Sequence, residues 1–205
     1  MMSKLILTSY GLTNSIGRKQ IRKAFGECNL TSDDLADKKI FLFHGPYCSI
    51  ESTLVEECEN LGFQKGNIIL SGQHRNNQEV LNCDFYYCTE GNTFEILSML
   101  REQGLDCAIR NGFFQGNKFY IGCSAGAAIA GSSIEQILDF DRNFVRMQDF
   151  SGLGLFDGII IPHYTKAELK HYIDNSPGIE QKYKKIYSVK NDGCKILEIP
   201  CGKMR

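Results

Sequence analysis

The chain has 205 residues, the length of one ordinary domain rather than two. It carries 23 Lys and Arg against 24 Asp and Glu, so its formal charge of −1 argues against the broad basic surface that binds nucleic acids through their phosphates. No apolar run approaches the roughly 20 residues needed to span a bilayer, and the apolar stretch near the start is too short for a secretory signal. We therefore expect a single domain over residues 1–205, cytoplasmic, monomeric or homodimeric, with neither nucleic acid nor membrane as a partner.

Short apolar runs alternate with helical patterns along the chain. The expected strands cover 5–8, 40–43, 68–70, 85–88, 118–121 and 158–161, and a closing pair of strands covers 186–189 and 195–199. The expected helices cover 15–26, 49–61 with Ser49 as N-cap, 93–103 and 125–134. Continuous apolar strands are typical of strands buried on both faces. The alternation predicts an α/β fold with a mostly parallel sheet covered by helices on both faces.

The nine cysteines are odd in number and scattered, and they form no C-x-x-C pair. This pattern is typical of reduced, small apolar side chains rather than of a disulfide framework or a zinc site. No phosphate-binding loop or dinucleotide fingerprint is present either. We expect no metal and no organic cofactor.

The most informative stretch lies between an expected strand and an expected helix. Gly122, Ser124 and Gly126 form a G-x-S-x-G pattern there, the context of a nucleophile elbow. The glycines let the chain turn sharply, so the Ser124 hydroxyl stands clear at the end of the strand. The following helix points its free N–H groups at the same place, where negative charge would develop. Cys123 is expected to face away and be buried.

A serine nucleophile needs a base, usually an imidazole. Of the four histidines, His44 belongs to an apolar strand, His74 to a polar loop and His171 to a surface helix. His163 directly follows the run 159–162 at the end of a buried strand, and such strand ends border the ligand crevice of open parallel sheets. His163 is therefore the predicted base.

The group that orients the base is left open by the residues alone. Asp192, in the turn between the last two expected strands, would give the chain order Ser–His–Asp, although Asn-Asp-Gly is also a common turn sequence. Four aspartates between Ser124 and His163 would instead give the order Ser–Asp–His of the α/β-hydrolases. They are Asp139, Asp141, Asp149 and Asp157.

Three motifs together resemble the peptidase E family, the aspartyl dipeptidases and their relatives, which include cyanophycinases. They are Gly122-Cys-Ser-Ala-Gly-Ala127, Glu90-Gly-Asn-Thr-Phe94 and Pro162-His-Tyr-Thr165. The resemblance extends from the first expected strand to the turn at Asp192, which is nearly the whole chain. It implies a flavodoxin-like three-layer sandwich of the class I glutamine amidotransferase-like type, with a serine in place of the amidotransferase cysteine.

The resemblance also implies roles for individual residues. Ser124 matches the nucleophile, His163 the general base and Asp192 the carboxylate that orients it, which favours the order Ser–His–Asp. The backbone N–H groups of Gly91 and Ala125 match the oxyanion hole. The candidates for substrate binding are Glu90, Asn92, Thr93, Tyr164, Thr165 and Lys166.

Three departures from the family pattern bear on specificity. Glu90 stands where the family has the first of two glycines, so its side chain could crowd the site, place a carboxylate beside the oxyanion or change the loop conformation. No arginine occurs between Arg146 and Arg205, where the aspartate-specific members carry one, and lysine binds carboxylates less directionally. Asp192 is one methylene shorter than the usual glutamate. Specificity for N-terminal aspartate is thus less firmly expected than hydrolase chemistry.

The expected function is that of a serine peptidase that hydrolyses small peptides through an acyl-enzyme, with dipeptides bearing an N-terminal aspartate as one substrate class. Two alternatives remain. The same Ser–His pair could serve an esterase or an amidase. The fold could also belong to a catalytically weak binding or regulatory protein, if Glu90 damages the oxyanion hole.

Overall fold

A computed structural model describes residues 1–46 and 48–201. The strands are β1 (Met2–Thr8), β2 (Ile40–Phe43), β3 (Ile68–Leu70), β4 (Phe85–Cys88), β5 (Phe119–Cys123), β6 (Ile159–Pro162), β7 (Ile186–Val189) and β8 (Cys194–Pro200). The α-helices are α1 (Ser15–Glu27), α2 (Ser32–Leu35), α3 (Glu51–Leu61), α4 (Asn77–Leu81), α5 (Thr93–Glu102), α6 (Leu105–Phe114), α7 (Ala125–Ile129), α8 (Lys166–Asp174) and α9 (Ile179–Lys182). Short 3₁₀ helices cover Cys48–Ile50, Lys65–Asn67 and Glu135–Asp139.

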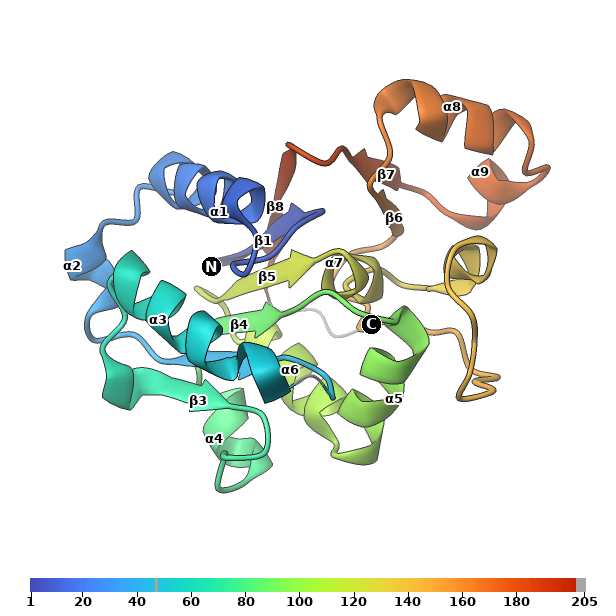
Figure 1. The fold of residues 1–205 in the computed structure, drawn as a ribbon. Helices are drawn as coiled ribbons and strands as arrows, with labels where there is room; N and C mark the ends of the chain where they lie inside the picture. Colours follow the sequence, from blue (N-terminus) through green and yellow to red (C-terminus); the bar gives the residue numbers. More distant parts are fainter. Residues whose placement is uncertain (47, 202–205) are drawn as a thin grey trace.

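In the described part of the chain, six strands form the main sheet in the order β3-β2-β4-β5-β1-β8, and β8 alone runs antiparallel to its neighbour. The mostly parallel α/β fold predicted from the sequence is confirmed. The strands β6 and β7 pair in parallel as a separate two-stranded sheet. Figure 1 shows this small sheet, with α8 and α9, beyond the carboxyl ends of β4, β5 and β1.

The central strands are buried on both faces, as their continuous apolar runs predict. In β2, Phe41 and Phe43 pack into one apolar cluster, whereas Ile40 and Leu42 pack into the other. Helices α5, α6 and α7 cover the first face, and α1 and α3 cover the second. Because helices pack on both faces of the sheet, the ends of its strands, from which the loops at the carboxyl edge begin, are fixed in position.

Three expectations about elements need correction. The strands 186–189 and 195–199 do not pair with each other, because β7 joins β6 and β8 joins β1. Ser49 is not the N-cap of α3, which follows a 3₁₀ turn and has Ile50 at that position. Helix α7 ends at Ile129 rather than at 134. Helices α2, α4, α6 and α9 are not among the predicted elements.

The helices in the described part of the chain are too short or too polar to cross a membrane. The cysteines whose side chains the structure describes are all free, while the side chain of Cys48 lies outside the described residues. Among the described residues, His, Cys, Asp and Glu side chains do not gather in groups of three that could hold a metal ion.

Candidate active site

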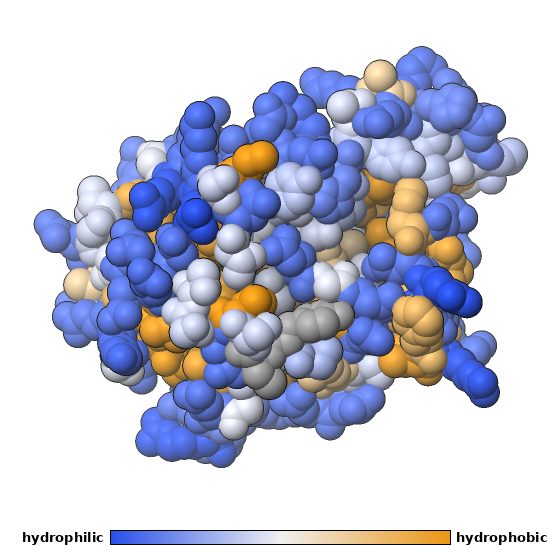
Figure 2. Space-filling model, in the orientation of Figure 1, coloured by the Kyte–Doolittle hydropathy of each residue, from blue (hydrophilic) through white to orange (hydrophobic). Residues whose placement is uncertain are grey.

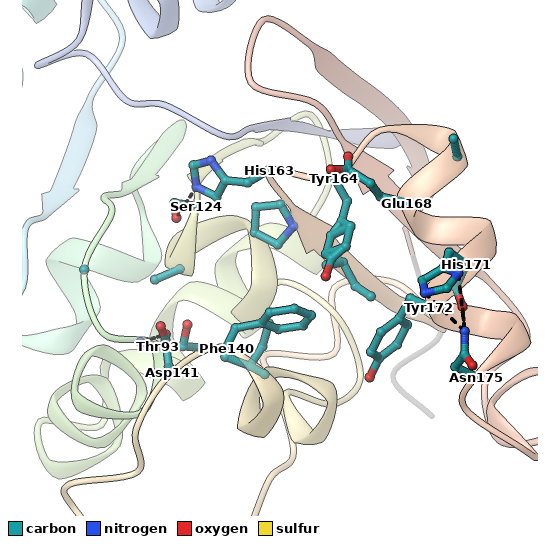
Figure 3. Close-up of a pocket in the computed structure, with 16 residues that line it drawn as sticks. Thr93, Ser124, Phe140, Asp141, His163, Tyr164, Glu168, His171, Tyr172 and Asn175 are labelled. Carbon is teal, nitrogen blue, oxygen red and sulfur yellow. Dashed lines mark hydrogen bonds between the residues drawn. The ribbon is translucent and has the colours of Figure 1, made fainter.

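Ser124 and His163 meet at the carboxyl edge of the main sheet. The Ser124 Oγ lies 2.9 Å from His163 Nε2, a hydrogen bond between residues 39 positions apart (Figure 3). Ser124 follows β5, and His163 follows β6 of the small sheet. The chemistry predicted for this pair requires that contact, because the imidazole has to accept the hydroxyl proton as the oxygen attacks.

The backbone at Ser124 has a φ of +49° and a ψ of −110°, a conformation that a non-glycine residue rarely adopts. The Ser124 N–H donates to the carbonyl of Thr8, which holds the turn against β1. The glycines make the turn possible: a Cβ on Gly126 would lie 2.1 Å from the Cys88 carbonyl oxygen, and one on Gly122 would lie 2.5 Å from the Gly126 carbonyl oxygen. The spacing of the motif thus reflects close backbone approach, and it leaves the serine hydroxyl projecting toward His163.

Asn191, rather than Asp192, contacts the other nitrogen of His163. The Asn191 Oδ1 lies 2.7 Å from His163 Nδ1. A carbonyl oxygen can only accept, so Nδ1 carries the proton and Nε2 is free to accept from Ser124. The Asp192 carboxylate pairs instead with the Lys190 ammonium at 3.0 Å, which lowers the pKa of Asp192. In this structure the turn therefore presents Asn191 to the imidazole, and the predicted Asp192 points to Lys190 instead.

Each of the four alternative aspartates has a described partner other than His163. Asp139 accepts from the Tyr172 hydroxyl, and Asp141 accepts from the backbone N–H of Thr93. Asp149 pairs with Arg101, and Asp157 pairs with Lys184. The chain order Ser–Asp–His has no support in the geometry.

Ser9, which belongs to none of the sequence motifs, ties the histidine loop to the sheet. Its fully buried hydroxyl donates to the Val189 carbonyl at 2.6 Å and accepts from the His163 N–H at 2.8 Å. One side chain thus joins the ends of β1, β6 and β7. His163 itself has a φ of +66°, a strained conformation that these contacts hold in place. A polar residue directly after the first strand was the only sequence signal for this role.

Gly91 and Ala125 border the cavity beside Ser124. Among the described residues, neither backbone N–H donates to an acceptor. Gly91 has a φ of +149°, which a side chain would disfavour, and Ala125 is the first residue of α7. Two unpaired donors next to the hydroxyl are the arrangement that an oxyanion hole needs.

Cys123, next to the nucleophile in sequence, is buried as predicted. Burial raises the pKa of its thiol to about 12, and the Thr8 hydroxyl donates to its sulfur. A thiol with such a pKa stays protonated at neutral pH and is a poor nucleophile. The exposed oxygen of Ser124 is therefore the group in this turn that can attack a carbonyl.

A cavity of about 770 Å³ opens beside the Ser124–His163 pair. It extends from Ser124 and Asp141 past the rings of Phe140, Tyr164 and Tyr172 to His171 (Figure 3). Its size suits a small peptide rather than a folded protein.

Residues 45–203 match the family model described as peptidase family S51. The chain belongs to peptidase family S51.

Similar proteins agree with this assignment. The uncharacterized peptidase Lmo0363 of Listeria monocytogenes is 38% identical over 89 residues, which are 42% of this chain and 43% of its own length. Peptidase E of Shewanella amazonensis is 36% identical over 107 residues, 51% of this chain and 44% of its own. The matches span about half the length of the curated relatives. The crystal structure of a candidate peptidase E from Listeria monocytogenes EGD-e shares the fold, with a TM-score of 0.67, 24% identity and coverage of 98% of this chain and 100% of that one.

The structure divides the predicted substrate-binding residues of this S51 protein into two groups. Thr93 and Tyr164 line the cavity. Asn92 instead caps α5 and donates to the Arg142 carbonyl, and Thr165 caps α8. Lys166 borders a separate, smaller groove. Asn92 and Thr165 act as caps because the first backbone N–H groups of a helix have no partner within the helix and bind a nearby side-chain oxygen.

Glu90 turns away from the cavity. Its Oε1 accepts from the Thr13 hydroxyl at 2.7 Å, and its Oε2 accepts from the Gly11 N–H at 3.4 Å. The carboxylate therefore ties the loop that carries Gly91 to the loop after β1. This geometry does not match the expectation that Glu90 crowds the site or binds substrate, because its carboxylate is directed to Thr13 and Gly11.

Glu90→Ala is expected to lower the free energy of unfolding by about 1–2 kcal/mol, because two acceptors of a partly buried charged group are lost. It should also reduce peptide hydrolysis rather than raise it, since the Gly91 loop loses its anchor. Urea denaturation measures the change in stability, and kcat/KM measures the change in activity. Thr13→Val should cause part of both losses, and the double variant should lose less than the sum of the two single variants. A gain in activity in Glu90→Ala would restore the view that the carboxylate obstructs the site.

Proposed function

We propose that this protein is a serine peptidase that hydrolyses small peptides, with Ser124 as nucleophile, His163 as general base and Asn191 as the group that orients the imidazole. The observation that carries the proposal is the continuous hydrogen-bonded chain from Ser124 Oγ through the His163 ring to Asn191 Oδ1, at 2.9 and 2.7 Å. Membership of family S51 and the similarity to peptidase E proteins support it.

In the first half of the reaction, His163 Nε2 takes the Ser124 proton as Oγ attacks the scissile carbonyl carbon. The carbonyl oxygen becomes an oxyanion, which the N–H groups of Gly91 and Ala125 stabilise. Asn191 keeps the proton of the neutral imidazole on Nδ1, so the ring accepts at Nε2. The imidazolium then protonates the leaving amine, the C–N bond breaks, and an ester to Ser124 remains.

In the second half, a water molecule replaces the amine. His163 removes one of its protons as the water oxygen attacks the ester carbonyl, and it returns a proton to Ser124 Oγ as the ester C–O bond breaks. The products are a free carboxylate and the regenerated serine.

We further propose that residues 1–205 form one domain of the class I glutamine amidotransferase-like type.

The proposal is tested with a panel of X-Leu dipeptides, where X is Asp, Glu, Asn, Ala or Lys, together with p-nitrophenyl esters of small acids. Release of leucine, and modification of Ser124 by a fluorophosphonate seen in the peptide mass map, are the expected results. Ester cleavage without leucine release would indicate an esterase. No turnover and no modification of Ser124 would overturn the proposal.

A further inference from the structure

The wall of the cavity opposite Ser124 is aromatic. Phe140 packs against Tyr164 with ring centroids 5.4 Å apart and against Tyr172 at 5.9 Å, and the two tyrosine rings are 6.3 Å apart. Phe140 nevertheless remains 42% exposed, in a loop whose apolar side chains gather on the right of Figure 2. Aromatic faces of this kind bind apolar stems and attract cations.

Two carboxylates and two imidazoles line the cavity together with these rings, whereas lysine and arginine side chains do not within the described part of the chain. Asp141 and Glu168 line the cavity, and within the described part of the chain no lysine or arginine lines it. Lys170, on the same helix as Glu168, pairs with Asp174 outside the cavity. Asp141 and Glu168 form no ion pair with another described residue. With His163 and His171 neutral, the lining of the cavity therefore carries negative charge that no lysine or arginine there offsets.

Each of the two carboxylates is anchored through one of its own oxygens, and its second oxygen is available to a ligand. Asp141 Oδ2 accepts from the Thr93 N–H at 2.8 Å, at the start of α5. Glu168 Oε2 accepts from the N–H and the hydroxyl of Thr165, and these bonds lower the pKa of Glu168. Asp141 Oδ1 and Glu168 Oε1 have no partner among the described residues. Anchored anions beside aromatic faces are suited to receive an ammonium or guanidinium group.

We propose that the cavity selects peptides with a cationic side chain, lysine or arginine, next to the scissile bond, and that Asp141 is the main specificity-determining residue. This inference rests on the proposed function, because the scissile bond is placed by Ser124. The long apolar stem of such a side chain lies along Phe140 and Tyr164 while its charge meets the carboxylate. An acidic side chain meets like charge there, so a preference for N-terminal aspartate is not expected in this S51 protein.

The test compares arginine with citrulline, which has the same length but a neutral urea in place of the guanidinium. Arg-Leu is assayed against Cit-Leu and Leu-Arg against Leu-Cit, at pH 8, above the range in which histidines ordinarily titrate. We expect the arginine member of one pair to have a kcat/KM roughly tenfold higher. We also expect Asp-Leu to be a poorer substrate than Asn-Leu.

Asp141→Asn removes the charge but keeps an oxygen for the Thr93 N–H, so it should reduce the arginine-to-citrulline ratio to roughly two. Glu102→Gln is the matched control, since it makes the same charge change at the exposed far end of α5 and should leave the ratio unchanged. Equal rates for arginine and citrulline in the wild type, or an unchanged ratio in Asp141→Asn, would overturn the inference.

Two further measurements test whether the side chain or the α-ammonium is recognised, and whether recognition requires turnover. N-acetylated peptides show whether the cation is the α-ammonium, and loss of activity on acetylation with no arginine preference would overturn the side-chain proposal. Calorimetry on Ser124→Ala compares the Kd values of the same peptide pairs without turnover. A preference for arginine in binding alone would keep the inference while the peptidase proposal fails. Equal affinities or no binding would overturn it.

Discussion

Replacing Ser124 with alanine is expected to reduce peptide hydrolysis by roughly 10⁴-fold to 10⁶-fold. The Ser124 Oγ is the hydroxyl within hydrogen-bonding distance of His163 Nε2, and the neighbouring thiol of Cys123 is buried with a pKa raised to about 12. No other group in the turn can form the acyl-enzyme. The residual rate would come from binding and from the oxyanion hole.

The same variant should fold normally. The Ser124 hydroxyl makes no capping bond to α7, and alanine meets the positive φ at this position no less easily than serine. Thermal unfolding should therefore occur within a few degrees of the wild type. Ser98→Ala, which removes a serine hydroxyl on the outer side of α5, is the matched control and should keep full activity. Activity of purified Ser124→Ala within tenfold of the wild type would contradict the proposed nucleophile.

Asn191 and Asp192 give the second large effect, because adjacent residues of one exposed turn are expected to respond in opposite ways. Asn191→Ala should lower kcat by roughly 10²-fold to 10³-fold, since His163 loses the acceptor that fixes its tautomer and orientation. Asp192→Asn should change kcat less than twofold, since that carboxylate pairs with Lys190 at 3.0 Å. Both side chains are exposed, so neither substitution is expected to unfold the protein. A difference in kcat between the two variants therefore reports on the contact with His163.

Asn191→Asp extends the test to pH. It keeps an acceptor facing Nδ1 and adds the charge that stabilises an imidazolium. The protonated, inactive form of the base then persists to higher pH, so the acid limb of the kcat/KM profile should move upward in pH while activity at pH 8 is retained. An equal loss of activity in Asp192→Asn and Asn191→Ala would contradict the assignment and restore Asp192 as the orienting group.

The sequence contained enough information for the fold class and for the choice of Ser124 and His163 as two residues that meet in the folded chain. Apolar runs such as 40–43 are typical of parallel strands that helices cover on both faces, and the alternation of such runs with helical patterns predicts that arrangement. The G-x-S-x-G spacing predicts a tight turn for a local reason, namely that a Cβ at Gly122 or Gly126 would collide with neighbouring backbone. His163 could be selected because it directly follows a buried strand. These inferences depend on neighbours in sequence, so the chain itself carries them.

Only the tertiary structure determined which way the side chains at the site point. Residues 190–193 form a turn whose successive side chains diverge, so only the folded backbone determines that Asn191 meets His163 and that Asp192 meets Lys190. Glu90 likewise could face the cavity or the loop after β1, and the partner that decides is Thr13, which lies 77 residues earlier. The bridging role of Ser9 and the negative charge of the cavity arise in the same way, from residues that are distant in sequence. Spacing along the chain determines which residues are available, but contacts across the sheet edge determine which of them face one another.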